Sequence, residues 1–152
     1  MNYNFSKWLT AILLMTTFMF SNQAFSEDPI YTGTFSSSAV SGYDTVAYFT
    51  EKKAVKGDDD FSTRYKGANW YFSSQENLLK FKKEPEKYAP QYGGYCAWAI
   101  AHNNFAKGDP KQWTVVNGKL YLNYNAAILE QWLADKETQI VNADAKWPAL
   151  IN

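Results

Sequence analysis

The stretch "QWTVVNGKLYLNY", residues 112–124, carries the clearest local folding signal in this chain. Its two arms are rich in β-branched and aromatic residues, and they flank the pair Asn117-Gly118. An Asn-Gly pair tolerates the left-handed backbone angles that a tight turn of type I′ requires. The stretch therefore predicts an antiparallel β-hairpin.

A second hairpin is predicted upstream. Phe61, Thr63 and Tyr65 alternate at the two-residue period of a strand, the turn "KGAN" follows, and residues 70–72 form the return strand. The segment "SGYDTVAYF", residues 41–49, suggests a short strand or a unit of turn and strand.

Capping signals predict the helices. Ser73 with Glu76 three residues later matches a capping box, and Pro85 ends the helix that would begin there. Residues 95–102, "YCAWAIAH", are the best candidate for a second helix, and Asn125 can cap a third.

The remaining segments complete one small domain. Residues 27–41 are small and polar and are expected to form an extended lead-in, while the tail at residues 140–151 is apolar enough to dock on the domain. No internal repeat is apparent. We therefore expect a single α+β domain over residues 42–152, with antiparallel β-hairpins and about three short helices.

The first 26 residues have the layout of a secretory signal peptide. Lys7 precedes an apolar run from Trp8 to Phe20, and Ala24 and Ser26 occupy the small-residue cleavage positions. The run of about 13 residues is shorter than the roughly 20 that span a bilayer. We expect a periplasmic or secreted protein without a stable membrane span after cleavage; the alternative is an uncleaved N-terminal anchor.

Charge and cysteine content exclude two classes of protein. The 15 basic residues include Lys7 of the leader, so 14 remain against 15 acidic residues, which excludes the clustered basic charge of a nucleic-acid-binding protein. The single cysteine excludes an internal disulfide, although export normally leads to an oxidising compartment. Cys96 is therefore a lone thiol.

The stretch "PQYGGYCAWAIAH", residues 90–102, holds the only cysteine and the only histidine. If the chain is helical from Tyr95 onward, unpaired N–H groups of the first turn favour a thiolate at Cys96. Gly93 and Gly94 allow another group to approach the backbone closely. Three roles for Cys96 stay open: a small buried hydrophobe, a metal ligand, and a redox or nucleophilic thiol.

Cys96 and His102 are the candidate metal ligands, for copper, zinc, nickel or iron. Six residues along a regular helix place their side chains some 120° and about 9 Å apart, so one ion can bind both only if the helix breaks near Ala101. Asp44, Asp109 or a tyrosine could add oxygen ligands. Asp44 follows a Gly-Tyr turn, where an Asp either caps the turn or serves as a site carboxylate.

Four blocks of the chain together resemble one protein family. They are "GYDTVAYF", "KGANWYFSSQENLLKFKKEPEKYAPQYGGYCAWA", "DPKQW" and "NGKLYLNYN". The chain resembles the YHS-domain proteins over about residues 42–147, in particular the long exported bacterial form with the "PQYGGYCA" signature. The resemblance implies a YHS-like fold.

The resemblance implies a metal site only if the metal-binding cysteines of the family are present in this chain. Short YHS domains are suspected metal binders through three cysteines, and this chain has Ala47, Ser73 and Asn77 at those positions. None of these side chains replaces a thiolate for a soft cation. Cys96, which belongs to the signature, is the one sulfur ligand left.

These observations favour a non-enzymatic exported binding module, since motifs of hydrolases, zinc proteases and phosphate-binding loops are missing. We expect it to hold a transition metal or a small ligand near Cys96, with Asp44, Tyr92, Gly93, Gly94 and Tyr95 as further ligand-binding residues. Two alternatives stay open: a thiol-dependent enzyme or redox sensor that uses Cys96, and a structural domain that binds a protein partner.

Overall fold

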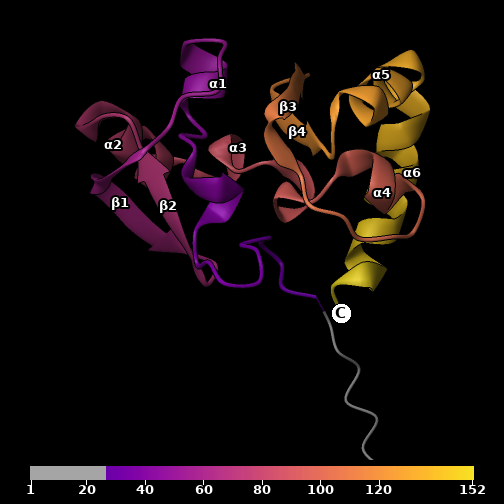
Figure 1. Cartoon of the computed structure of the whole chain (residues 1–152), viewed down its shortest axis with the longest axis horizontal. Coiled ribbons are helices and arrows are strands. Elements are labelled where there is room, and N and C mark those ends of the chain that lie inside the picture. The colour runs from indigo at the N-terminus through magenta and orange to yellow at the C-terminus, as the bar shows by residue number, and fades with distance from the viewer. Residues whose placement is uncertain (1–26) are drawn as a thin grey trace, which may run out of the picture.

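The computed structural model describes residues 27–152, and the predicted leader, residues 1–26, lies outside the described residues. Two β-hairpins, each with its own helices, form two halves that stand side by side (Figure 1). The first half consists of η1 (Ala39–Gly42), α1 (Ala47–Thr50), β1 (Asp58–Tyr65), β2 (Ala68–Phe72), α2 (Gln75–Lys83) and α3 (Pro85–Tyr88). The second consists of η2 (Gln91–Gly94), α4 (Ala97–Ala101), β3 (Asp109–Val116), β4 (Lys119–Asn123), α5 (Ala126–Ala134) and α6 (Lys136–Leu150).

Both predicted hairpins are confirmed, and the chain is an α+β domain. β1 pairs with β2 and β3 with β4, each antiparallel, so the two sheets have two strands apiece. Asn117 and Gly118 turn the second hairpin at φ values of 50° and 73°. Their left-handed backbone is the conformation that the Asn-Gly pair predicted.

The helix predictions hold with one shift of register. Asn125 caps α5, since its Oδ1 accepts a hydrogen bond from the N–H of Ile128 at 2.9 Å. Ser74, not Ser73, caps α2. The described chain has six α-helices rather than about three, because several are single turns, and none of them is both long and apolar enough to cross a membrane.

The segment 41–49 is not a strand, contrary to the sequence prediction. It leaves the left-handed turn of η1 and enters α1 at Ala47. The Asp44 carboxylate accepts hydrogen bonds from the N–H groups of Val46 and Ala47, which curls the chain into a helical turn instead of letting it extend.

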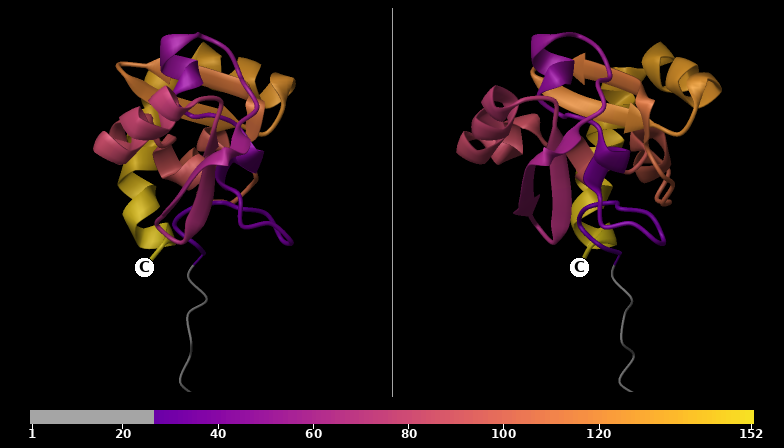
Figure 2. Two further views of the ribbon diagram at one scale, coloured as in Figure 1. Left: turned by 90° about the vertical axis from the view of Figure 1, so that its left-hand side faces the viewer. Right: turned by 60° about the vertical axis from the view of Figure 1, so that its left-hand side comes forward.

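The second half repeats the build of the first, a repeat that the sequence did not reveal (Figure 2). Each half has a left-handed 3-10 turn, a short helix, a hairpin whose register shifts at the same place, and a helix after the hairpin. The equivalent elements begin 51 residues apart, at Asp58 and Asp109, Ala68 and Lys119, and Gln75 and Ala126. The backbone shows this structural repeat, and the tripeptide Lys-Gly-Asp at residues 56–58 and 107–109 is a trace of it in the sequence.

Each half has its own aromatic core. The ring centroids of Trp70 and Phe81 lie 4.8 Å apart in the first core, and those of Tyr121 and Trp132 lie 5.3 Å apart in the second. The hydroxyl of buried Tyr48 donates to the carbonyl of Pro110 at 2.7 Å and so joins the two halves. The lead-in also contributes, because Ile30 and Val40 are buried in the first core.

Gly93 is tied to the lead-in at a point where no side chain fits. Its φ is 62°, and a Cβ atom there would lie 1.9 Å from the carbonyl oxygen of Pro29. Gly67 has a φ of 82° and nothing within 4 Å of such an atom, so it is a matched control.

We expect Gly67→Ala to cost about 1 kcal/mol of unfolding free energy, the usual penalty for a left-handed alanine. Gly93→Ala should cost about 2 kcal/mol more, since it also displaces the lead-in. Urea denaturation measures both. Equal losses in the two variants would show that the contact of Gly93 with Pro29 does not matter.

Candidate functional site

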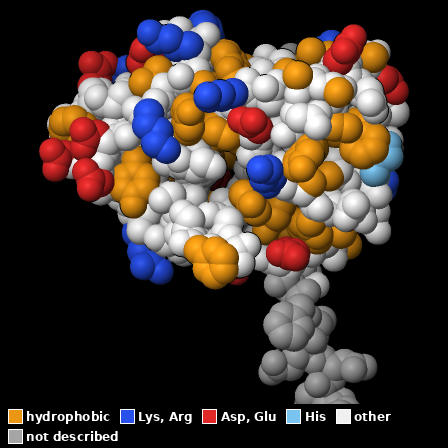
Figure 3. Space-filling model, in the orientation of Figure 1, with side chains coloured by type: hydrophobic (Ala, Val, Ile, Leu, Met, Phe, Trp, Pro, Cys, Tyr) orange, Lys and Arg blue, Asp and Glu red, His pale blue; other side chains and the backbone are white. Residues whose placement is uncertain are grey.

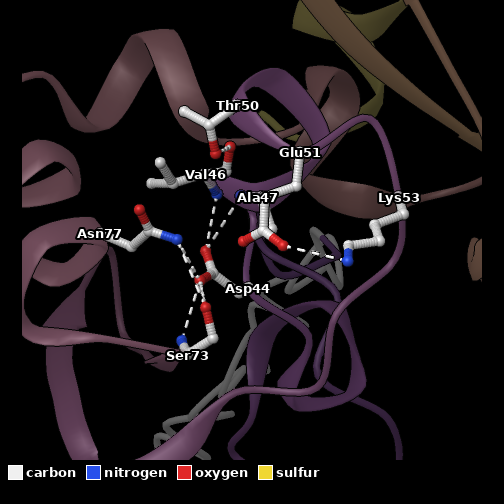
Figure 4. Close-up of polar contacts among 8 residues, drawn as sticks. All are labelled: Asp44, Val46, Ala47, Thr50, Glu51, Lys53, Ser73 and Asn77. Carbon is white, nitrogen blue, oxygen red and sulfur yellow. Dashed lines mark hydrogen bonds and ion pairs between the residues drawn. The ribbon is translucent and has the colours of Figure 1, made fainter.

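Asp44 is the most heavily hydrogen-bonded side chain that the structure describes (Figure 4). Its side chain is fully buried. One carboxylate oxygen accepts hydrogen bonds from the N–H groups of Val46 and Ala47, at 2.9 and 3.2 Å. The other accepts from the N–H and the hydroxyl of Ser73, at 2.8 and 2.7 Å, and from Nδ2 of Asn77 at 2.7 Å. Five donors therefore surround a buried anion.

Three separate elements deliver these donors. Val46 and Ala47 lie at the entry to α1, Ser73 follows the end of β2, and Asn77 lies in the first turn of α2. The Ser73 hydroxyl donates a hydrogen bond to Asp44, and the side chain of Ser74 caps α2 in its place. Of the two roles weighed for Asp44, the structure shows the cap of the turn. The same carboxylate also joins the end of β2 to α2.

The three positions that the family resemblance assigns to cysteines meet at this carboxylate. Ala47 offers only a backbone N–H, while Ser73 and Asn77 donate to Asp44 from their side chains. A soft cation requires thiolate or imidazole ligands, and none of these groups is one. These residues do not fit the suspected metal site of short YHS domains.

Cys96 lies in the other half, buried to 1% exposure, as the residue that precedes α4. Its Sγ donates to Oδ1 of Asn123 at 3.7 Å. Burial raises the pKa of the thiol, and the backbone N–H groups of Ala99, Tyr124 and Trp98 act in the opposite direction without forming a side-chain cap hydrogen bond. The thiol is therefore neutral at pH 7, unlike the thiolate that the sequence suggested.

His102 faces solvent at the end of α4 (Figure 3). Its ring stacks on Trp98 with centroids 3.9 Å apart, and its Nδ1 lies 2.7 Å from the Trp98 carbonyl oxygen. The helix does end at Ala101, the break that joint ligation would require. Even so, His102 is exposed and Cys96 is buried, and their side chains contact different groups, the carbonyl of Trp98 and the amide of Asn123.

The turn of the signature, η2 and Tyr95, connects the two halves and is held by hydrogen bonds of its tyrosines. The Tyr92 hydroxyl donates to the Asp144 carboxylate at 2.8 Å, and that of Tyr95 donates to the Asp28 carbonyl at 3.0 Å. Burial raises the pKa of both hydroxyls, with the neighbouring acidic groups adding to the effect. Gly94 continues the turn at a φ of 89°. These residues adjoin Cys96 along the chain, whereas Asp44 belongs to the other half.

A hollow of about 220 Å³ opens beside the turn. Tyr92 and Gly93 line it together with two aromatic residues, Tyr65 from the first hairpin and Trp147 from α6. Lys66 and Glu86, an exposed ion pair at 3.8 Å, also line it. The hollow thus combines ring faces with charged groups and draws on both halves and the lead-in.

Two more hollows of about 500 Å³ each share Ser38 and Ser41. Residues 56–58 line one of them and the equivalent residues 107–109 line the other. The sequence analysis did not find these hollows, nor Asn123 beside Cys96. The two Lys-Gly-Asp tripeptides were the available signal, and they become informative only once the duplication is known.

Residues 46–92 match the family model of the YHS domain. The matched stretch contains Ala47, Ser73 and Asn77, and it ends before Cys96. Neither the comparison with curated proteins nor the comparison with solved structures gave a match.

The Asp44 network should dominate the stability of the first half. We expect Asp44→Asn to lower the unfolding free energy by about 2 kcal/mol or more, because an amide donor would then face other donors. The exposed Asp60 provides the control, and Asp60→Asn should change stability by less than about 0.5 kcal/mol. Chemical denaturation measures both changes. An Asp44→Asn variant with the unfolding free energy of the wild type would contradict the prediction.

The buried thiol should make stability depend on pH. Because folding raises the Cys96 pKa, its contribution is fully present below the pKa of an unfolded cysteine, about 8.5, and is lost as the pH rises towards the folded value. Above pH 8.5 the unfolding free energy should therefore fall more steeply for the wild type than for Cys96→Ser, by up to about 1.4 kcal/mol per pH unit. The buried tyrosines are the same in both proteins, so their contributions cancel in the comparison. Parallel curves of unfolding free energy against pH would contradict a raised pKa of Cys96.

Proposed function

Starting from a chain that carries a YHS domain at residues 46–92, we propose that it is an exported, non-enzymatic binding module for a small ligand. The ligand site is the hollow beside the signature turn. One observation carries the proposal: the positions of the suspected metal ligands are filled by the sealed Asp44 network, while Tyr92 and Gly93 line an open hollow. Export rests on the predicted leader at residues 1–26.

The walls of the hollow indicate the kind of ligand. Tyr65, Tyr92 and Trp147 present rings, which suit a flat aromatic or apolar molecule. A volume of about 220 Å³ is below the roughly 300–1,000 Å³ of sites for drug-sized ligands, so the ligand is smaller. Lys66 and Glu86 can orient a polar substituent on it.

Cys96 does not complete a metal centre in this proposal. Its sulfur contacts the amide of Asn123, which is a weak ligand for soft cations, and His102 is exposed and stacked on Trp98. Purified protein exposed to copper and zinc and then passed over a chelating resin should retain less than one ion per chain. Stoichiometric metal that is lost in Cys96→Ser would contradict this part of the proposal.

Indole and phenol serve as probes of the hollow. We expect saturable NMR shift changes at Tyr92, Gly93 and Trp147 during titration with these probes. Ala89 also lines the hollow, so Ala89→Phe should fill it and reduce probe affinity at least about tenfold. Ala126→Phe on the exposed side of α5 is the matched control and should leave affinity unchanged. NMR shifts that grow linearly without saturation, or equal probe affinity in both variants, would contradict the proposed ligand site.

A further inference from the structure

The outer edge of β1 has backbone hydrogen-bonding groups that the chain leaves unused. Arg64 lies opposite Asn69 in the hairpin, and the Asn69 N–H points away from β1, since it donates to the Ser37 carbonyl at 2.7 Å. In an antiparallel ladder both members of such a pair direct their backbone groups outward, so those of Arg64 point away from β2. Those of Ser62, two residues along, do the same. Within residues 27–152, neither Ser62 nor Arg64 has a hydrogen-bond partner outside the hairpin.

β1 lies on the outer side of the first half, with β2 between it and the second half (Figure 1). The far edge of β2 is closed by a bridge between Asn69 and Ser38, whereas no strand within residues 27–152 pairs with the far edge of β1. From Phe61 to Tyr65 the side chains alternate between half-buried and exposed, as in an extended strand. An exposed strand with a row of unpaired groups is a ready template for another strand.

The charges along β1 change sign about Ser62. The acidic run at residues 58–60 precedes it, and Arg64 and Lys66 follow it. The carboxylates of the run lie within 4.8 Å of one another, and within the described part of the chain neither the run nor Arg64 forms an ion pair. Because like charges this close repel each other, a cation brought beside the run is stabilised.

We propose that β1 is an interaction surface on which a second copy of this chain lays its own β1, antiparallel and related by a two-fold axis at Ser62. The two Ser62 residues then exchange hydrogen bonds between their N–H and carbonyl groups. Asp60 of each copy lies opposite Arg64 of the other, so the axis creates two pairs of opposite charge. A two-fold axis at Arg64 would instead bring the two Arg64 side chains together. The charges therefore select the axis at Ser62.

An apolar contact is available at the same edge. Thr63 and Tyr65 of β1 and Phe81 of α2 line a hollow of about 190 Å³. In the proposed register Phe61 of the second copy lies opposite Thr63, on the half-buried face of the strand, where its ring would cover the hollow. Residues 59–61 have no partner in β2, because the register of the hairpin shifts there. Pairing with a second copy therefore breaks no contact of the hairpin.

Sedimentation equilibrium of the protein tests the pairing. We expect a reversible dimer between about 10 µM and 1 mM, weaker than complexes of standard size because a single strand edge buries little surface. Arg64→Glu and Asp60→Arg should each weaken it at least about fivefold, since each replaces two attractive pairs by two repulsive ones. The double variant Asp60→Arg/Arg64→Glu restores opposite charges across the axis and should return the dissociation constant to within about twofold of the wild type.

Lys111→Glu is the matched control for the single variants. Lys111 is exposed and lies 51 residues after Asp60, at the equivalent place in the second hairpin. The residue equivalent to Arg64 is Val115, so β3 lacks the charge pattern of β1. The control should keep the dissociation constant of the wild type. A monomer throughout the concentration range, or a double variant as weak as the single variants, would overturn the proposal.

A cross-link tests the position of the axis. In the proposed register the two Ser62 Cα atoms lie about 5.5 Å apart, within the span of a disulfide. Mild oxidation of Ser62→Cys should therefore give a covalent dimer, whereas Lys111→Cys should stay monomeric; the buried Cys96 is common to both variants. Equal cross-linking in the two variants would contradict the register. If an added lysine-rich peptide protects the Ser62 and Arg64 amides from hydrogen exchange in a chain that stays monomeric, the edge serves another partner and the proposal fails.

Discussion

The buried carboxylate of Asp44 is the interaction on which the arrangement of the first half depends. A buried anion without partners is strongly unfavourable, so it persists only where donors surround it. Here Ser73 and Asn77 reach it from 29 and 33 residues away. The requirement to satisfy this one charge fixes the start of α1, the end of β2 and the first turn of α2 against each other (Figure 4).

The two halves share one build but differ in chemistry at equivalent positions. At equivalent backbone positions the first half has a carboxylate with side-chain donors, and the second has the Cys96 thiol beside Asn123. The same backbone arrangement therefore surrounds the charged Asp44 carboxylate in one half and the neutral Cys96 thiol in the other. Tyr48 and the signature turn join the halves, and the hollow that we propose as the ligand site lies along this junction.

Local signals predicted much of the fold correctly. The turn at Asn117-Gly118, the cap at Asn125 and the end of α2 just before Pro85 all follow from backbone preferences within a few residues. The prediction of a strand at residues 41–49 was wrong because the Asp44 carboxylate accepts hydrogen bonds from the N–H groups of Val46 and Ala47. These bonds curl the stretch into a helical turn despite its β preference. The structural repeat was missed for a different reason: the strand register and the turns are the same in both halves, while most side chains that a sequence comparison reads differ.

The sequence by itself determined where the hairpins turn, which residues begin the helices, that no internal disulfide forms, and that Cys96 is the one sulfur ligand of the signature. Only the tertiary structure decided that the Cys96 thiol is buried and neutral, that His102 is exposed and stacked on Trp98, and that Asp44 accepts from donors of three elements. Turns and caps depend on contacts between neighbours in the chain. Burial and the ionisation of a thiol depend on groups that packing brings together from distant segments, and no local pattern encodes that proximity.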